Sequence, residues 1–181
     1  MTRIAIIDRK DMNPEQARVH DAALAAGSVV GGPYYVYIHQ PDLFEAAQHL
    51  RMTLENAPLS ARERQIVNLT VARYWNAEYP WAVQARRSLS IGIDRAVVDA
   101  LNARQTPDLP DRRERLCHVV ARDMLANKGL SDAVFKEAEQ AFGQAQLIAL
   151  VATIGSFTMT CLTTATFQIA APADIPVPLA R

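Results

Sequence analysis

Apolar residues recur at helical spacing along most of this chain, and helix-start signals stand ahead of them. The run 13-NPE-15 joins a capping side chain, a proline suited to a first turn and an acid near the positive end of a helix. The run 60-SARE-63 is a capping box ahead of a further apolar repeat. No period-two alternation is longer than residues 34–38, and no internal repeat is present. The pattern predicts an all-α, single-domain helical bundle of about eight helices.

Glycines, prolines and polar loops mark the breaks between these helices. Pro80 lacks an N–H and clashes with a preceding helical turn, so we expect it to begin a helix and not to interrupt one. Residues 34–41 should be extended or irregular, and the proline-rich tail 171–181 should lie along a neighbouring surface. The expected helices cover residues 13–27, 41–56, 60–75, 80–90, 94–103, 111–127, 131–142 and 147–169.

Composition narrows the class of protein further. The 181 residues suit one domain, with a core over about residues 13–170, and the formal net charge is zero. No charge imbalance points to nucleic acid or an anionic membrane surface. The two cysteines, Cys117 and Cys161, form no metal-ligand spacing, so we expect neither a metal nor another cofactor. The first residues show no signal-peptide pattern, and we expect a cytoplasmic protein.

One long stretch, residues 140–173, contains no charged residue. Its apolar part, 147–169, is long enough to cross a bilayer. However, it carries six threonines and lacks basic flanks, which favours a buried helix over a membrane span. A helix this apolar exceeds what one small subunit can cover, so we expect a homo-oligomer, with Thr160 and Thr164 at the subunit interface.

The order of several motifs resembles the carboxymuconolactone decarboxylase family, whose relatives include the alkylhydroperoxidase D-like (AhpD-like) proteins. The matching segments cover about 150 residues: 32-GPYYVYIHQPDL-43, 58-PLSARERQIVNLTVARYWNAEYPW-81, 91-IGIDRAVVDAL-101, 130-LSDAVFKEAEQAFG-143 and the apolar helix from Leu147. The resemblance implies an all-α fold that assembles as a trimer or hexamer. It also places reactive residues at the start of the helix near Pro80.

The reactive residues of that family are replaced here. The redox members carry C-x-x-C with a histidine four residues later, and Ala77, Pro80 and Gln84 stand at these places. The glutamate of the preceding helix falls on Gln65. Decarboxylase-like members usually read Glu-Trp-x-x-His, of which only Trp81 is kept. Peroxide reduction needs an activated thiolate, so we do not expect a C-x-x-C peroxidase.

If a pocket persists at this helix start, its free N–H groups would favour a carboxylate or enolate. We expect Gln65, Tyr79, Trp81 and Gln84 to line it. Glu78 would serve as a general acid or base, or else as a solvated acid at the positive helix end. Tyr79 would donate a proton, or else be a half-buried aromatic residue with a bonded hydroxyl.

Two further residues are candidates for this site. His39 would reach it from the N-terminal segment, or else bond backbone as a turn histidine. Arg73 would pair with a substrate carboxylate, or else with an acid of its own protein. We assign no role to the other histidines, His20, His49 and His118.

Three functions follow from these residues. The first is a non-redox enzyme, carboxy-lyase or isomerase-like, that decarboxylates a small carboxylated or lactone-type substrate or moves a proton on it. The second is a catalytically inactive, oligomeric ligand-binding relative. The third, disfavoured, is a thiol peroxidase that uses Cys117 or Cys161, because free cysteines of this kind are usually buried and inert.

Overall fold

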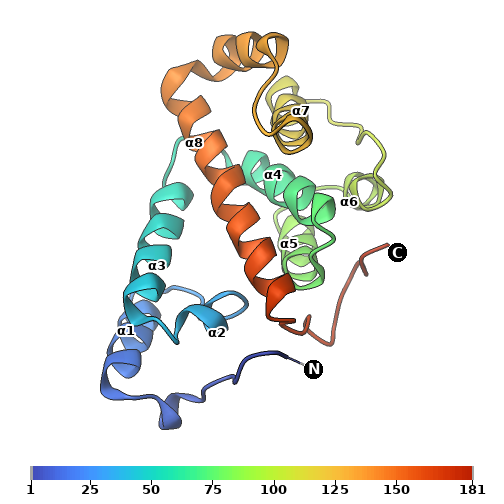
Figure 1. The fold of residues 1–181 in the computed structure, drawn as a ribbon. Helices are drawn as coiled ribbons and strands as arrows, with labels where there is room; N and C mark the ends of the chain where they lie inside the picture. The colour runs from blue at the N-terminus through green and yellow to red at the C-terminus, as the bar shows by residue number, and fades with distance from the viewer. Residues whose placement is uncertain (1, 181) are drawn as a thin grey trace.

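A computed structural model describes residues 2–180, which leaves Met1 and Arg181, the end of the predicted tail, outside the described residues. The described part is all-helical and contains no strand (Figure 1). A short 3-10 turn, Arg9–Asp11, precedes eight α-helices. These are α1 Pro14–Ala25, α2 Tyr34–Tyr37, α3 Pro41–Glu55, α4 Ala61–Tyr74, α5 Glu78–Ser90, α6 Arg95–Asn102, α7 Arg112–Asn127 and α8 Asp132–Thr166. The prediction of an all-α fold with about eight helices is confirmed.

The predicted caps are confirmed at the starts of α1 and α4, whereas Asp94 before α6 and Ser131 before α8 make no side-chain cap. The Asn13 side chain accepts hydrogen bonds from the backbone N–H groups of Glu15 and Gln16, and the Gln16 side chain bonds back to Asn13 N. Ser60 and Glu63 form the reciprocal pair at the start of α4, with 2.7 Å from Ser60 N to Glu63 Oε2. These bonds satisfy N–H groups that a helix start otherwise leaves without partners.

Two elements differ from the prediction. Residues 34–37 form one helical turn and not an extended segment, because Tyr34 and Tyr37 both turn into the core, with ring centroids 5.7 Å apart in an edge-to-face contact. Helix α5 begins at Glu78, so Pro80 lies in its first turn, where the missing N–H costs no hydrogen bond. Asn76, with a φ of 48°, makes the break before it.

Helix α8 combines the two helices predicted over 131–142 and 147–169. They meet at Gly143, whose φ of 67° and ψ of 170° are not helical, and the ribbon bends there (Figure 1). Such a conformation is essentially restricted to glycine. The break lets the charged first part pack beside α7 while the uncharged second part runs through the middle of the fold.

Helix α4 is the centre of the larger hydrophobic cluster and packs against α5, α6, α7 and α8. Its side chains Ile66, Val67, Leu69 and Val71 are fully buried. A second cluster joins α1, α2 and α3 around Phe44. Because α8 contacts α3 on one side and α4 and α5 on the other, it lies between the two clusters (Figure 1).

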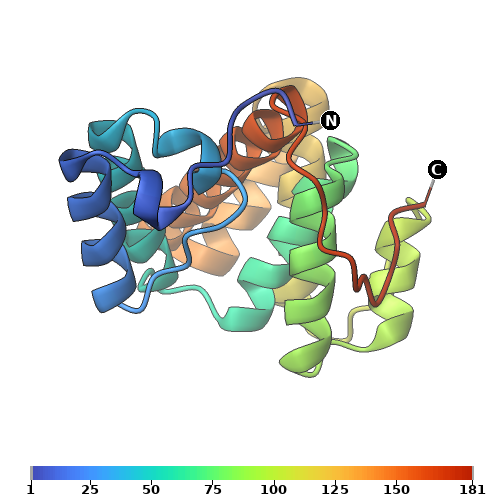
Figure 2. The same cartoon turned by 90° about the horizontal axis from the view of Figure 1, so that it is seen from below.

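The C-terminal tail lies along α5 and α6, as expected of a segment that cannot be helical (Figure 2). The indole N–H of Trp81 donates to Val177 O at 2.8 Å. The side chain of Asn102 donates to Pro178 O and accepts from Ala180 N, each at 2.8 Å. Asp174 pairs with Arg86. Four anchors therefore hold this segment on its own subunit.

Helix α8 is long and apolar enough to span a bilayer by length and composition, and 33% of its most apolar 18-residue stretch is buried inside the protein. Ile148, Met159 and Leu162 stay exposed on one face of the helix. Thr164 is not at the surface, because it is 3% exposed within the subunit and donates to Thr160 O. The expectation that Thr164 lies at a subunit interface is therefore wrong.

Candidate functional site

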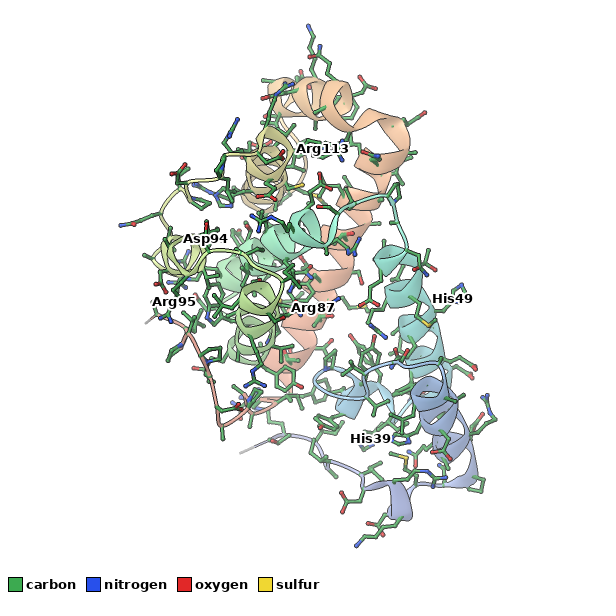
Figure 3. All side chains as sticks on the ribbon, turned by 180° about the vertical axis from the view of Figure 1, so that it is seen from behind. His39, His49, Arg87, Asp94, Arg95 and Arg113 are labelled. Atoms are coloured by element: carbon green, nitrogen blue, oxygen red, sulfur yellow. The ribbon has the colours of Figure 1, made fainter. Side chains whose placement is uncertain are left out.

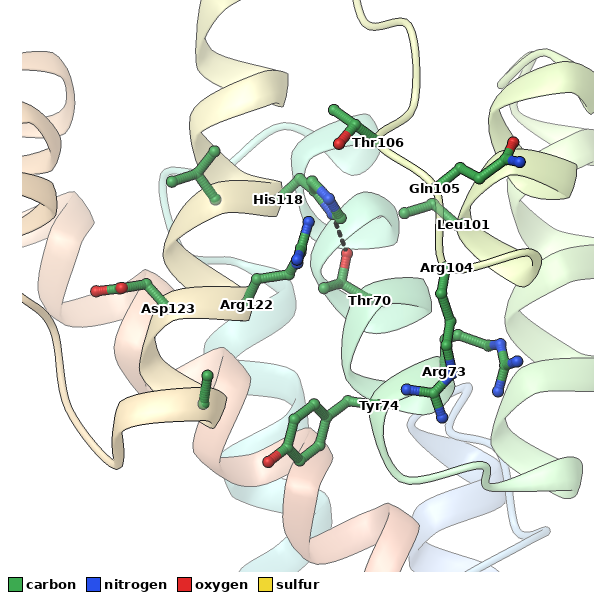
Figure 4. A pocket seen from close by; sticks show the side chains of 12 residues that line it. Thr70, Arg73, Tyr74, Leu101, Arg104, Gln105, Thr106, His118, Arg122 and Asp123 are labelled. Atoms are coloured by element: carbon green, nitrogen blue, oxygen red, sulfur yellow. Dashed lines mark hydrogen bonds between the residues drawn. The ribbon is translucent and has the colours of Figure 1, made fainter.

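A cleft of about 580 Å³ opens between α4, α6 and α7 (Figure 4). We call it the arginine cleft, because three arginines and one histidine stand among its lining residues. These lining residues are Thr70, Arg73, Tyr74, Leu101, Arg104, Gln105, Thr106, His118, Val119, Arg122, Asp123 and Ala126. Its size falls in the range of roughly 300–1,000 Å³ that is usual for small-molecule sites.

Two of the arginines are held by one neutral oxygen. Arg73 and Arg104 both donate to Asn76 Oδ1, the latter at 3.1 Å. Arg73 also donates through Nε to Asn102 O at 2.5 Å. Burial and the nearby charge of Arg104 both lower the pKa of Arg73. Asn76 therefore orients the two guanidinium groups without neutralising either of them.

The third arginine, Arg122, has no acidic partner within salt-bridge distance among residues 2–180. The one acid of the cleft, Asp123, is occupied elsewhere. It accepts hydrogen bonds from Asn127 Nδ2 at 2.8 Å and from the backbone and hydroxyl of Ser131 at 2.7 and 3.0 Å. Figure 4 shows Asp123 pointing away from the cleft while Arg122 points into it. The cleft is therefore positively charged.

His118 forms the floor of the cleft together with Thr70. Its Nδ1 lies 2.9 Å from Thr70 Oγ1, and that hydroxyl donates to Ile66 O at 2.7 Å (Figure 4). Nε2 of the ring is buried without a hydrogen-bond partner among the described residues. Burial, assisted by the charge of Arg122, lowers the pKa of His118 to about 4. The imidazole is therefore neutral near pH 7.

Two predicted residues at the start of α5, Tyr79 and Trp81, are packed and do not line this cleft. Trp81 is 0% exposed and lies under the C-terminal tail. The Tyr79 ring lies against the loop at Gly31 and Gly32, where a Cβ on Gly32 would stand 2.5 Å from Tyr79 Cε1. Burial raises the pKa of Tyr79. Of the predicted site residues, only Arg73 lines the arginine cleft.

The carboxamides at the family's reactive positions are a separate buried feature. Gln65 is 2% exposed, and its Nε2 has no hydrogen-bond partner among the described residues. Oε1 of Gln84 and Oδ1 of Asn68 are likewise buried and unpaired. Unpaired buried polar groups cost about 1–3 kcal/mol each, so these side chains on α4 and α5 lower the stability of the fold.

Glu78 and His39 lie apart from both features. Glu78 is exposed in the first turn of α5, where its carboxylate suits the positive helix end. His39 lies at the turn between α2 and α3, and its Nε2 bonds Ala5 O at 2.9 Å. Figure 3 shows His39 near the N-terminal helices, at the opposite end of the molecule from Arg113 on α7. Their catalytic roles stay predictions.

Neither thiol is placed for redox chemistry. Cys117 and Cys161 are both 0% exposed and unpaired with each other. Burial raises the pKa of Cys117 strongly and that of Cys161 to about 12. Thiols in this state are not thiolates near neutral pH, and they have no access to a peroxide.

Sequence reasoning missed His118, Thr70, Arg104 and Arg122. A signal was present on α7, where His118 and Arg122 stand one helical turn apart and share a face. Thr70 is likewise a polar residue among the fully buried side chains of α4. The two helices bring these residues together although Thr70 and His118 are 48 positions apart.

Comparison with protein-family models finds no match for this sequence, and comparison with curated proteins finds none either. Solved structures do match. The AhpD-core, peroxidase-related protein from Ralstonia eutropha JMP134 shares 16% identity over 98% of this chain and 97% of its own, with a TM-score of 0.77. A peroxidase-related protein from Silicibacter sp. TM1040 shares 17% identity over 99% and 96%, with a TM-score of 0.76.

A third match is the debrominase Bmp8 in complex with 2,3,4-tribromopyrrole, with 18% identity over 96% of this chain and 93% of its own, and a TM-score of 0.75. These likenesses define the class of protein: the chain has the AhpD-like fold. The narrower likeness to carboxymuconolactone decarboxylases stays a prediction.

Proposed function

We propose that this protein binds a small organic acid in the arginine cleft and acts on it by decarboxylation or proton transfer, without a thiol. One observation carries the proposal. Arg73 and Arg104 share a neutral oxygen, and Arg122 has no acidic partner among the described residues. A carboxylate has two acceptor oxygens that match a planar guanidinium group, so an organic acid is the ligand whose chemistry fits this cleft.

The other side chains that line the cleft indicate the chemistry of the rest of the ligand. Leu101, Val119 and Ala126 are apolar, whereas Gln105 and Thr106 offer polar groups at the rim. A small carboxylated or lactone-type molecule with an apolar body would meet both kinds of surface. A small-molecule ligand agrees with the AhpD-like fold, since a debrominase of that fold has been solved with a bound tribromopyrrole.

Thiol-independent chemistry agrees with the burial of both cysteines. Decarboxylation and proton abstraction each develop a carbanion or enolate, which needs positive charge held in place more than it needs a nucleophile. Guanidinium groups fixed by Asn76 supply that charge before the reaction begins. The chemistry therefore belongs in the arginine cleft and not at the start of α5, where Trp81 is covered.

Titration calorimetry with malonate, and with the uncharged malonamide as a control ligand, tests the proposal. Arg122→Gln should weaken malonate binding by roughly tenfold or more, because a hydrogen bond to a charged group contributes about 1.5–3 kcal/mol. Asn76→Asp should weaken it too, since a carboxylate at that place would neutralise Arg73 and Arg104. Arg112→Gln, on the exposed side of α7, should leave it unchanged.

Incubation with small carboxylic acids, followed by NMR, then separates the enzyme from a binding relative. Loss of carbon dioxide from a bound acid, or exchange of one of its protons, supports the enzyme. An acid that binds and is never altered supports the inactive relative. Malonate binding that survives both Arg122→Gln and Asn76→Asp would mean that the ligand site is elsewhere.

A further inference from the structure

The contacts of Thr70 favour one tautomer of His118. A threonine hydroxyl has one hydrogen, and Thr70 Oγ1 lies 2.7 Å from Ile66 O, which can only accept, and 2.9 Å from His118 Nδ1. Both contacts are hydrogen bonds together only when Thr70 donates to Ile66 O and Nδ1 donates to Thr70, so Nδ1 carries the ring proton in this arrangement. The neutral imidazole then presents Nε2 as a lone pair.

That lone pair is the one buried ring nitrogen without a partner in the described residues. His118 is 5% exposed and lies at the floor of the arginine cleft. Arg122, an exposed side chain one turn further along α7, points toward the ring (Figure 4). A carboxylate bound by Arg122 would therefore lie close to the His118 ring.

Resting on the function proposed above, we infer that His118 Nε2 is the proton acceptor of the arginine cleft and that Thr70 is the residue that positions it. The substrate would then be a carboxylate with a removable proton on a carbon next to a carbonyl group. The proton moves from that carbon to Nε2, and the electron pair of the broken C–H bond stays on the substrate as an enolate. The guanidinium group of Arg122 stabilises that charge until the imidazolium returns the proton, to another atom of the enolate to give an isomer or to the same carbon to give proton exchange.

The charged groups near His118 explain why its imidazole is neutral before a substrate binds. The charged groups at the cleft are Arg73 on α4, Arg104 after α6, and Arg122 and Asp123 on α7. The Tyr74 hydroxyl, which can also titrate, donates a hydrogen bond to Leu125 O. Asp123 is turned toward Ser131, so the positive charge of Arg122 acts on the ring without an acid to offset it. A bound anion offsets that charge and favours the imidazolium, so the base becomes stronger when the substrate is present.

NMR titration of the His118 ring, with and without malonate, tests the inference. The signal is assigned by its loss in His118→Gln. We expect nitrogen shifts that report a proton on Nδ1 and a free Nε2, and a titration midpoint that rises by more than one pH unit with saturating malonate. Thr70→Val should abolish the single tautomer, and Thr70→Ser should restore it, because serine keeps the hydroxyl.

The outcomes separate this inference from the proposed function. Malonate binding that weakens in Arg122→Gln, together with a His118 titration midpoint that malonate does not change, would overturn the role of His118. A ring proton on Nε2 would overturn it too. In both cases the arginine cleft would still be the anion site. If malonate does not bind at all, the proposed function falls. The wild-type and Thr70→Ser measurements decide the matter even if Thr70→Val does not fold.

Discussion

The guanidinium group of Arg73 donates to the backbone oxygen of Asn102 at 2.5 Å, and the side-chain amide of the same Asn102 holds the C-terminal tail at two points. One residue therefore joins the arginine cleft to the segment that covers Trp81. The predicted and the observed sites are linked through this asparagine, although they do not share a cavity.

Asn102→Ala should release the tail while it keeps the backbone oxygen for Arg73. Two hydrogen bonds are lost, and at about 1 kcal/mol each the free energy of unfolding should fall by about 2 kcal/mol. Urea unfolding gives this value, and a red shift of tryptophan fluorescence reports the uncovering of Trp81. Asn56→Ala, at an exposed asparagine directly after α3 whose side chain makes no hydrogen bond among the described residues, is the matched control and should change neither quantity. Identical behaviour of the two variants would contradict the anchoring role.

His118 should make the stability of the protein depend on pH. Its pKa is about 4 when folded and 6.5 in its ordinary environment, so the unfolded chain binds more protons between these values. Stability therefore rises with pH from about 4 to 6.5, by about 3 kcal/mol in all, and is fully present above 6.5. His118→Gln should flatten this part of the profile. Urea unfolding at a series of pH values, in buffers without carboxylate or phosphate, measures the free energy of unfolding. The same dependence of this free energy on pH in the wild type and in His118→Gln would refute the assignment.

Gly143→Ala should destabilise the fold through the backbone alone. The conformation of Gly143 is strained for any residue with a Cβ, although no atom lies within 4 Å of the place where that Cβ would stand. The expected loss is about 1–3 kcal/mol. Gly155→Ala, in a regular part of the same helix with equally open space, should stabilise by up to about 1 kcal/mol. Thermal unfolding compares the two, and a neutral Gly143→Ala would show that the bend is not required.

The exposed apolar face of α8 is our proposed contact between copies of the chain. Ile148, Met159 and Leu162 are 62%, 37% and 44% exposed and lie along one side of the helix. Ile148→Arg combined with Leu162→Arg should lower the oligomeric state in sedimentation velocity, because charge cannot be buried there without a partner. Gln140→Arg, on the earlier part of α8, serves as the control. An oligomer that survives the double change places the contact on another surface.

Both cysteines should resist a thiol reagent in the native protein. At pH 8 a thiol with a pKa of about 12, as for Cys161, is ionised in roughly one molecule in ten thousand. The chromogenic disulfide DTNB should therefore give no fast reaction with the folded chain and two reactive thiols after denaturation. A fast native reaction at Cys117 or Cys161 would reopen the peroxidase hypothesis.

The helices could be predicted because their signals are local. The box at Ser60 and Glu63 and the prolines Pro14 and Pro41 each act within one turn of chain, and the structure places helix starts beside them. The turn Tyr34–Tyr37 escaped prediction because aromatic and β-branched residues favour extended structure, and only burial of the two tyrosines overrides that preference.

The arginine cleft could not be read from the sequence in the same way. Its arginines come from α4, from the loop after α6 and from α7. An arginine without an acidic partner looks like any other arginine until the fold shows what surrounds it. Arg73 is a candidate carboxylate ligand in the sequence, with pairing to an acid of its own protein as the alternative. His118 is given no role there, because its partner Thr70 lies on another helix.

The position of α8 has a consequence for how the chain is made. This helix supplies Leu147, Leu150 and Ile154 to the larger hydrophobic cluster, and it follows α1 to α7 in the sequence. Until it leaves the ribosome, the sides of α4 and α5 that it covers stay open to solvent, so the larger cluster cannot be completed earlier. Chaperones that shield apolar surface would therefore act on this protein until α8 has been made.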